Sequence, residues 1–272
     1  MGMDEGFLTG TLAAMKWPDV KRLVERDAMV LLPCGVLEEH GPHLPLATDV
    51  LTAVLQCRRL TSWLGEQGQT AVLAPPFHWG VCQSTGSFVG SFRVRKETAT
   101  ALAYDILASL AAFGFRRCVG VNAHGDIDQN LALMDAFRQA REECGLDARF
   151  LFDEWRLGPY GLTGQEPWLC VLPPRQGAVG WAEAPDVHAG DIETATILRH
   201  WPGWVDDDLA RTLPPVTLAE QDVMPWLFGG QTERLSPLGY VGAPAQAHGV
   251  DVDALMGEFA ARAGQALLAA MA

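Results

Sequence analysis

Apolar positions along the chain follow two spacings, one typical of buried strands and one typical of amphipathic helices. Short, nearly continuous apolar runs predict strands at 28–33, 70–74, 117–122 and 148–152. Apolar residues spaced three and four apart predict helices at 17–26, 49–63, 96–113, 129–144 and 251–270, and a further helix that ends near His200. Strand and helix alternate at least four times, which is typical of a parallel sheet covered by helices on both faces.

Three long segments between these elements show no regular spacing of apolar residues. Residues 77–95 combine aromatic residues with glycines, and we expect this loop to border a pocket. Residues 154–187 hold tryptophans among many glycines and prolines, so they form either a lid over a site or an irregular segment packed on the surface. Residues 201–247 are expected to be rich in loops.

The first group of chemically active side chains comes directly after the first predicted strand. Glu38, Glu39, His40, His43 and Asp49 stand there among glycines and prolines. Carboxylate oxygens together with imidazole nitrogens suit zinc, manganese or iron(II). Side chains two positions apart in an extended segment point the same way, so Glu38 and His40 share a face and Glu39 points away. The alternative is ordinary surface charge on a loop, and the short Glu-x-His motif alone does not decide between the two.

Two further groups of histidine and carboxylate occur later in the chain. Asn122-Ala-His124-Gly-Asp126 follows the third predicted strand, and His188-Ala-Gly-Asp-Ile-Glu193 opens a predicted helix. In open α/β sheets, ligands bind beyond the carboxyl ends of the strands. The first two groups both fall there, which predicts that they converge on one site.

Composition narrows the classes of partner. The net charge is −13 and no basic cluster is longer than a pair, which argues against nucleic acid or an anionic membrane. We expect no membrane-spanning helix, because no apolar run reaches about 18 residues, and we expect a cytoplasmic protein, because the amino terminus lacks a signal-type stretch. The six scattered cysteines form no Cys-x-x-Cys pair, so reduced structural thiols are expected. Cys34 and Cys82 lie near the predicted site, but neither has the distinctive sequence context of a nucleophile.

The three groups together resemble the motifs of the creatininase family of metal-dependent amidohydrolases. Residues 38–49, Glu-Glu-His-Gly-Pro-His-Leu-Pro-Leu-Ala-Thr-Asp, are similar to the family's Glu-Gln-His-Gly-Pro-His-Leu-Pro-x-x-Thr-Asp. Residues 188–194 match its His-Ala-Gly-x-x-Glu-Thr. The resemblance continues from Trp17-Pro18 to residues 242–244 and so covers essentially the whole chain. It implies a single domain over residues 1–272 with an α/β fold of three layers, αβα, around a mostly parallel sheet.

The resemblance also implies two divalent ions, zinc or manganese, with iron as a further candidate. Glu38 and His124 would hold one ion, His40 and Asp126 the other, and Asp49 would bridge the two. In the family's type enzyme an acidic residue at the position of Asp126 is a metal ligand. Paired metals lower the pKa of a bridging water and polarise a carbonyl group, which suits hydrolysis.

Several other residues receive roles from this resemblance. His188 is the first candidate to carry a proton to the departing nitrogen, because imidazole titrates near neutrality; alternatively, it caps backbone groups at a helix start. Glu193 would serve as a base behind it, or as a metal ligand if Asp126 is too short. The candidates for lining or covering a substrate pocket are Trp79, Ser84, Trp155 and Trp181.

The sequence departs from the family pattern at several positions, which indicates a divergent member. Asp126 and Ile127 replace the Gly-Asn of the common Asn-Gly-His-Gly-Gly-Asn, Glu39 replaces a glutamine, and Ala195 replaces a serine. The leading hypothesis is an amidohydrolase that cleaves the C–N bond of a cyclic amide or another small amide, a bond other than a peptide bond. The alternatives are a peptidase that trims a modified peptide, similar to the mycofactocin-maturation enzymes, and a metal-binding homologue without catalysis. By resemblance we expect a homohexamer.

Overall fold

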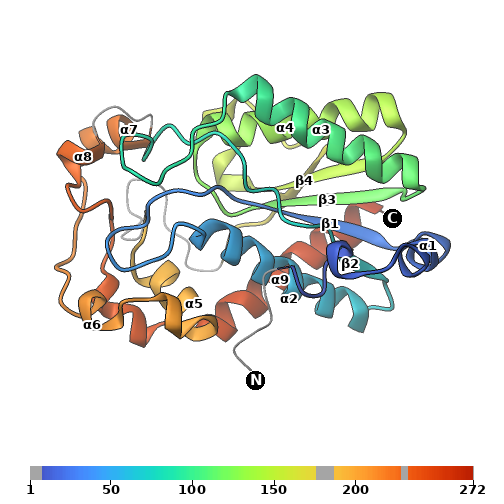
Figure 1. Ribbon diagram of the computed structural model, residues 1–272. Helices are drawn as coiled ribbons and strands as arrows, with labels where there is room; N and C mark the ends of the chain where they lie inside the picture. The colour runs from blue at the N-terminus through green and yellow to red at the C-terminus, as the bar shows by residue number, and fades with distance from the viewer. Residues whose placement is uncertain (1–7, 176–186, 228–231, 272) are drawn as a thin grey trace.

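The computed structural model describes residues 8–175, 187–227 and 232–271 of the chain (Figure 1). Its strands form a five-stranded sheet in the order β2-β1-β3-β4-β5, and every pair of neighbours is parallel. The strands are β1 Met29–Cys34, β2 Ala71–Leu73, β3 Arg117–Asn122, β4 Asp147–Asp153 and β5 Leu169–Leu172. The predicted parallel sheet is confirmed.

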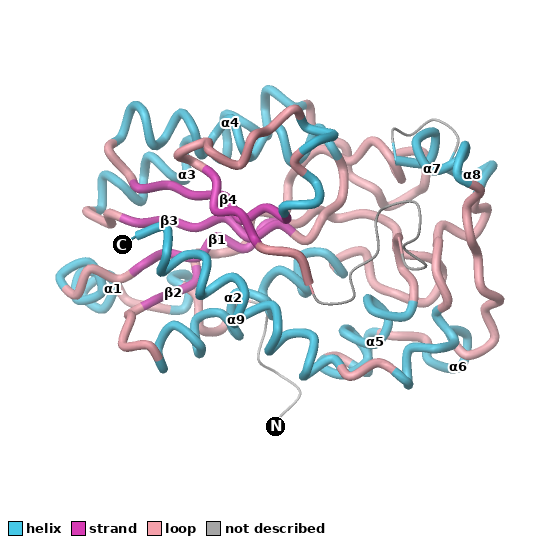
Figure 2. The backbone as a smooth tube through the Cα atoms, turned by 180° about the vertical axis from the view of Figure 1, so that it is seen from behind, coloured by secondary structure: helices cyan, strands magenta, loops and turns pink. Residues whose placement is uncertain are grey.

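Helices cover both faces of this sheet. The longer ones are α1 Trp17–Glu25, α2 Thr48–Glu66, α3 Lys96–Phe113, α4 Ile127–Cys144, α5 Asp191–His200 and α9 Val252–Met271. Figures 1 and 2 show α3 and α4 on one face and α2 and α9 on the other. The three-layer αβα architecture predicted from the sequence is therefore confirmed.

Alternate residues of the interior strand β1 pack into two cores, one on each face of the sheet. Val30 and Leu32 pack into the core that contains residues of α3 and α4. Met29 and Leu31 pack into the core that contains residues of α2 and α9. Because both faces of a parallel sheet are covered, the strand reads as one continuous apolar run rather than an alternating one.

Two regions differ from the sequence prediction. Residues 169–172, inside the segment interpreted as a lid or a packed surface segment, form the edge strand β5. Leu169 of β5 lies opposite Phe150 of β4. Four apolar residues before Pro173 are too few to show a period, so the strand was missed. The stretch 201–247, predicted as loop-rich, holds the short helices α6 Asp207–Ala210, α7 Glu220–Leu227 and α8 Thr232–Leu235.

The end of the sheet where the strands finish carries most of the irregular structure. In Figure 1, α5 to α8 lie beyond the carboxyl ends of the strands, at the left of the view. The long loops after β1 (35–47) and after β2 (74–95) run into the same region, and the short connection after β3 ends there. Among the helices described, none combines the length and apolar character of a membrane span.

Candidate metal centre

Side chains from all three predicted groups meet beyond the ends of β1 and β3. His124 Nδ1 lies 2.8 Å from Glu38 Oε1 and 3.0 Å from Asp49 Oδ2. The other oxygen of Asp49, Oδ1, lies 3.3 Å from His40 Nε2. Asp49 therefore stands between two histidines, with one carboxylate oxygen toward each.

The elements place these groups by simple local rules. Glu38 and His40 lie in the extended segment after β1, and Asp49 lies in the first turn of α2, where the helix dipole favours a carboxylate. His124 follows β3, the direct neighbour of β1, and the side-chain amide of Asn122 donates to the carbonyl oxygen of His124 at 2.8 Å. The parallel pairing of β1 and β3 thus brings together residues more than 80 positions apart.

The close approach of α2 to the end of β1 depends on Gly35. A Cβ atom at this position would lie 2.7 Å from the backbone nitrogen of Val50 and 2.8 Å from the carbonyl carbon of Asp49. Both atoms belong to the backbone of the first turn of α2, which cannot give way as a flexible side chain does. The absence of a side chain at Gly35 therefore lets Asp49 reach the two histidines.

His40 is held in one orientation by its own segment. Its Nδ1 donates to the carbonyl oxygen of Glu38 at 3.1 Å, so Nε2 faces the carboxylates. Glu193 Oε2 lies 3.9 Å from that Nε2, and the same oxygen accepts the backbone N–H of Ala189 at 2.5 Å. A backbone partner on one ring nitrogen fixes which nitrogen is free to bind a metal.

Asp126 occupies a different place. Its Oδ1 accepts the backbone N–H of Gln129 at 3.1 Å and caps α4, while Oδ2 accepts the backbone N–H of Gln83 at 2.6 Å. Among the described residues, three sets of side chains have ligand atoms close enough to share a metal ion, and Asp126 is in none of them. The sets are Glu38 with Cys82 and His124, Glu38 with His40 and His188, and His40 with Asp49 and Glu193. The structure places Glu193 beside His40, the alternative that the sequence left open.

The loop 77–95, which was expected to border a pocket, contacts Glu38. The hydroxyl of Thr85 and the thiol of Cys82 both donate to Glu38 Oε2, the thiol from 3.3 Å. The backbone N–H of Glu39 donates to Ser91 Oγ at 3.0 Å. Ser84, the residue named from the sequence, is buried, and its backbone oxygen accepts the hydroxyl of Thr232.

His188 contacts the cluster through Glu39 and His40. Its Nε2 donates to the backbone oxygen of Glu39 at 2.8 Å and lies 3.6 Å from Glu39 Oε1. Its ring centroid is 4.3 Å from that of His40 and 5.4 Å from the ring of Trp226. Trp226, a buried residue of α7, was missed by the sequence analysis, because nothing in the stretch 201–247 marked it as part of a site.

The tryptophans chosen from the sequence lie differently. Trp79 and Trp155 are 42% and 40% exposed. Trp79 packs edge-on against Phe92 with ring centroids 5.3 Å apart, and the guanidinium of Arg156 lies 6.0 Å from the ring of Trp155. Trp181 lies outside the described residues. Of the four residues predicted to line a substrate pocket, only Ser84 is buried among the described ones.

The electrostatics of the cluster favour positive charge at its centre. Burial raises the pKa of Asp49, but His40 and His124 outweigh burial and hold this pKa well below its ordinary value. Burial lowers the pKa of His124, but Glu38 and Asp49 outweigh it and hold this pKa well above its ordinary value. The carboxylates therefore remain charged although they are buried, and they demand cationic partners.

Burial and neighbouring charges also shift the pKa values of His188 and Glu38 in opposite directions. Burial lowers the pKa of His188, yet the carboxylates of Glu38, Glu39 and Glu193 raise it to about 10. Burial raises the pKa of Glu38, while His124 and His188 bring it below its ordinary value. A buried site that stabilises several protonated imidazoles would stabilise divalent cations for the same electrostatic reason.

The donor atoms fit such cations. Carboxylate oxygens and imidazole nitrogens are ligands of zinc and manganese. Two buried atoms of the cluster, Asp49 Oδ2 and His124 Nε2, have no hydrogen-bond partner of acceptable geometry. A buried polar atom without a partner is costly, and a metal ligand is one reason to keep it.

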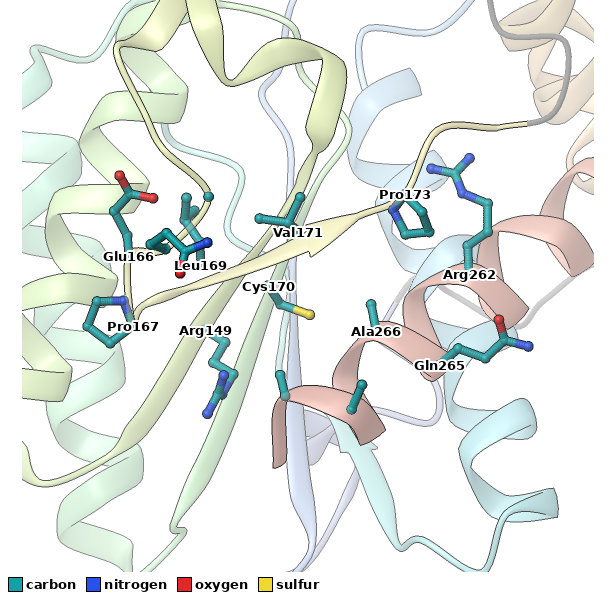
Figure 3. Close-up of a pocket in the computed structure, with 14 residues that line it drawn as sticks. Arg149, Glu166, Pro167, Leu169, Cys170, Val171, Pro173, Arg262, Gln265 and Ala266 are labelled. Atoms are coloured by element: carbon teal, nitrogen blue, oxygen red, sulfur yellow. The ribbon is translucent and has the colours of Figure 1, made fainter. Parts of the chain in front are cut away.

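A surface pocket of about 500 Å³ lies elsewhere, beside the edge strand β5. Figure 3 shows residues of β5 and α9 on opposite sides of it. Its arginines are already paired, Arg149 with Asp147 at 3.0 Å and Arg262 with Asp153 at 2.9 Å. None of its lining residues belongs to the cluster around Asp49, so this pocket is not part of the candidate site.

Comparisons with known proteins agree with the motifs. A family model described as creatinine amidohydrolase matches residues 13–267. A creatinine amidohydrolase of Pseudomonas putida is 28% identical over 218 residues, covering 78% of this chain and 79% of that protein. A mycofactocin precursor peptide peptidase of Mycobacterium ulcerans is 31% identical over 226 residues, covering 82% of this chain and 77% of that protein. The two relatives are named for different hydrolytic activities.

Solved structures show the same fold at lower identity. A crystal structure of creatinine amidohydrolase (creatininase) matches with a TM-score of 0.66 and 23% identity, covering 96% of each chain. A putative creatinine amidohydrolase from Bacteroides fragilis matches with a TM-score of 0.63 and 19% identity, covering 100% of this chain and 98% of that chain. Because the family model spans residues 13–267, while identity to the relatives stays low, this chain belongs to the creatininase family as a divergent member.

Proposed function

We propose that this protein is a metal-dependent amidohydrolase that cleaves the C–N bond of a cyclic amide or another small amide. The observation that carries the proposal is the buried meeting of Glu38, His40, Asp49 and His124 beyond the carboxyl ends of β1 and β3. Membership of a family of hydrolases supports it.

The residues suggest how two divalent cations would be held. Glu38 and His124 would hold one, His40 and Glu193 the other, and Asp49 would offer one oxygen to each. Solved relatives described as “Creatininase Mn” and as a mutant of “Zn-Zn type” support manganese or zinc. When bound, such ions lower the pKa of a water molecule and polarise a carbonyl oxygen.

His188 is placed to hold and deliver a proton. Its Nε2–H is engaged by the backbone oxygen of Glu39, which leaves Nδ1 as the atom from which a proton is transferred to a departing nitrogen. Glu193 holds the N–H of Ala189 and so fixes the turn that presents the imidazole. The ring of Trp226 covers one side of His188 and limits the access of water.

A second candidate function is trimming of a modified peptide. The relatives named mycofactocin precursor peptide peptidases favour it, at 31% and 29% identity over 82% and 85% of this chain. The same buried cluster serves either reaction, because both require attack on an amide carbonyl. Substrate size separates the two reactions.

The test joins metal content with a substrate panel. Protein purified without chelator is assayed for metal by mass spectrometry and for hydrolysis of creatinine, other cyclic amides, formamides and short peptides. We expect about two equivalents of metal, as in two-metal hydrolases, and turnover that disappears in Glu38→Ala while the far-ultraviolet circular dichroism stays unchanged. Turnover of peptides alone would favour the second candidate function. A parent protein that binds no metal after reconstitution would overturn both.

A further inference from the structure

Cys82 lies among the side chains proposed to hold one of the two cations. We infer that its Sγ is an additional ligand of the cation at Glu38 and His124, and that it makes this position selective for thiophilic metals. The inference rests on the proposed metal centre and concerns a residue that the sequence motifs do not include.

The geometry brings the sulfur within reach of that cation. Cys82 Sγ lies 3.3 Å from Glu38 Oε2, and ligand atoms of Cys82, Glu38 and His124 all lie within 4.8 Å of one another. Ligands about 2.0–2.3 Å from a shared zinc ion in tetrahedral arrangement lie about 3.3–3.8 Å apart. The sulfur-to-oxygen distance already has this value.

Cys82 is buried together with other side chains that can bind a metal. Cys82 is fully buried, and Glu38 and His124 are 1% and 3% exposed. His124 Nε2 and Asp49 Oδ2, both buried in the same cluster, lack a hydrogen-bond partner of acceptable geometry. Buried polar atoms that lack a well-formed hydrogen bond are costly, and coordination of a cation by this cluster is one reason to keep them.

A purely structural role explains the thiol less well. Without a cation, the Sγ of Cys82 lies 3.0 Å from Thr85 Oγ1 and 3.3 Å from Glu38 Oε2, and the hydroxyl of Thr85 already donates to that same oxygen of Glu38. A hydroxyl is a much better donor than a thiol, so Glu38 does not need Cys82 as a hydrogen-bond partner. On coordination the thiol proton passes to solvent, and the sulfur binds the cation as thiolate.

A thiolate changes which metals the position prefers. Sulfur ligands select zinc, cobalt and cadmium, whereas manganese prefers oxygen ligands. The second position, with His40, Asp49 and Glu193, offers only oxygen and nitrogen. The two positions of one site would therefore differ in metal preference, with the softer metal at Cys82.

Cobalt(II) reports on the sulfur directly. The full chain is stripped of metal, kept reduced under anaerobic conditions and titrated with cobalt(II), followed by absorption. Visible bands report binding of cobalt as such, and a near-ultraviolet charge-transfer band reports a cobalt–thiolate bond. Cys82→Ser keeps a side chain of similar shape without sulfur. Cys34→Ala is the matched control, because Cys34 is equally buried at the end of β1 but its thiol donates to the backbone oxygen of Leu32 and packs in the core with α3 and α4.

The expected result is a charge-transfer band in the parent and in Cys34→Ala that is absent from Cys82→Ser, which still shows the visible bands. Competition titrations should show zinc affinity falling at least about 10- to 100-fold in Cys82→Ser, the range found when a residue that only supports a metal ligand is lost, with manganese affinity unchanged. Visible bands without a charge-transfer band in the parent would overturn the inference and leave the proposed function standing. No cobalt binding by the parent would overturn both.

Discussion

Replacing Gly35 by alanine tests whether the metal centre depends on the close packing of α2 against the end of β1. The added Cβ would lie 2.7 Å from the backbone nitrogen of Val50, about 0.7 Å inside the 3.4 Å limit of ordinary contact. It would also lie 2.8 Å from the carbonyl carbon of Asp49. Because φ at Gly35 is not in the left-handed region, backbone strain contributes nothing and the whole effect comes from this contact.

The size of the effect follows from overpacking. Inserting one carbon into a packed interior costs about 1–3 kcal/mol of unfolding free energy. Urea denaturation of the metal-free protein should therefore show a midpoint lower by roughly 0.5–1 M. The first turn of α2 must also retreat, and a shift beyond about 0.5 Å disturbs a metal site. Asp49 moves with it, so metal affinity should fall as well.

Gly65→Ala is the matched control in the same helix. A Cβ at Gly65 meets nothing within 4 Å, so this substitution should be neutral or stabilise the protein by about 0.5–1 kcal/mol. Stability is measured by urea denaturation and metal affinity by calorimetry for both variants. If Gly35→Ala keeps the stability and metal affinity of the parent, then α2 does not position Asp49 through this contact, and the reasoning is refuted.

Three further outcomes are expected. Glu193→Gln should lower the bound metal, measured by mass spectrometry, from about two equivalents to about one. Asp126→Ala should keep the metal but lower the free energy of unfolding, measured by urea denaturation, by about 0.5–2 kcal/mol, because the cap of α4 is lost. The reverse pattern would make Asp126 the ligand. Five of the six cysteines are buried, so a thiol reagent should label only Cys144 rapidly in the native protein and all six in denaturant; rapid labelling of a second thiol would contradict the packing. Burial and the charge of His40 lower the pKa of His43 from 6.5 to about 4. Between pH 6.5 and 4 the unfolded chain therefore carries a proton on His43 that the folded protein does not. The free energy of unfolding should fall by up to about 3 kcal/mol as the pH drops from 6.5 to 4. A His43→Gln variant that loses as much stability over this pH range would refute this.

Much of the fold follows from periodicity. The predicted strand 117–122 and the predicted helix 96–113 match β3 and α3 residue for residue, because each is long and strongly patterned. The helix ends at Gly114, whose φ of +101° is readily adopted only by a residue without a side chain. The edge strand β5 was missed because its four residues carry no periodic signal and its pairing with β4 is a tertiary contact.

Part of the candidate site could also be predicted from the sequence, and part could not. The two-residue spacing of Glu38 and His40 and their position after β1 were readable, since they depend on local geometry and on the direction of a parallel sheet. The choice between Asp126 and Glu193 was not, because it depends on which backbone amides each carboxylate meets. Trp226 approaches His188 from a distant part of the chain, and no local pattern encodes such a contact.

The scatter of the cluster along the chain has a consequence for biosynthesis. Glu38, His40 and Asp49 are synthesised early, and His188 and Glu193 follow roughly 150 residues later. Glu39 and His188, which are in contact, lie 149 positions apart in the sequence. At about 5–20 residues synthesised per second, His188 and Glu193 are added roughly 8–30 s after Glu38, His40 and Asp49. The cation proposed at His40 and Glu193 needs both parts of the chain and would therefore bind the completed fold and not the nascent chain. By mass action it would add about 2.7 kcal/mol of stability at 100 times its dissociation constant. Metal supply would act as a late checkpoint on maturation of this protein.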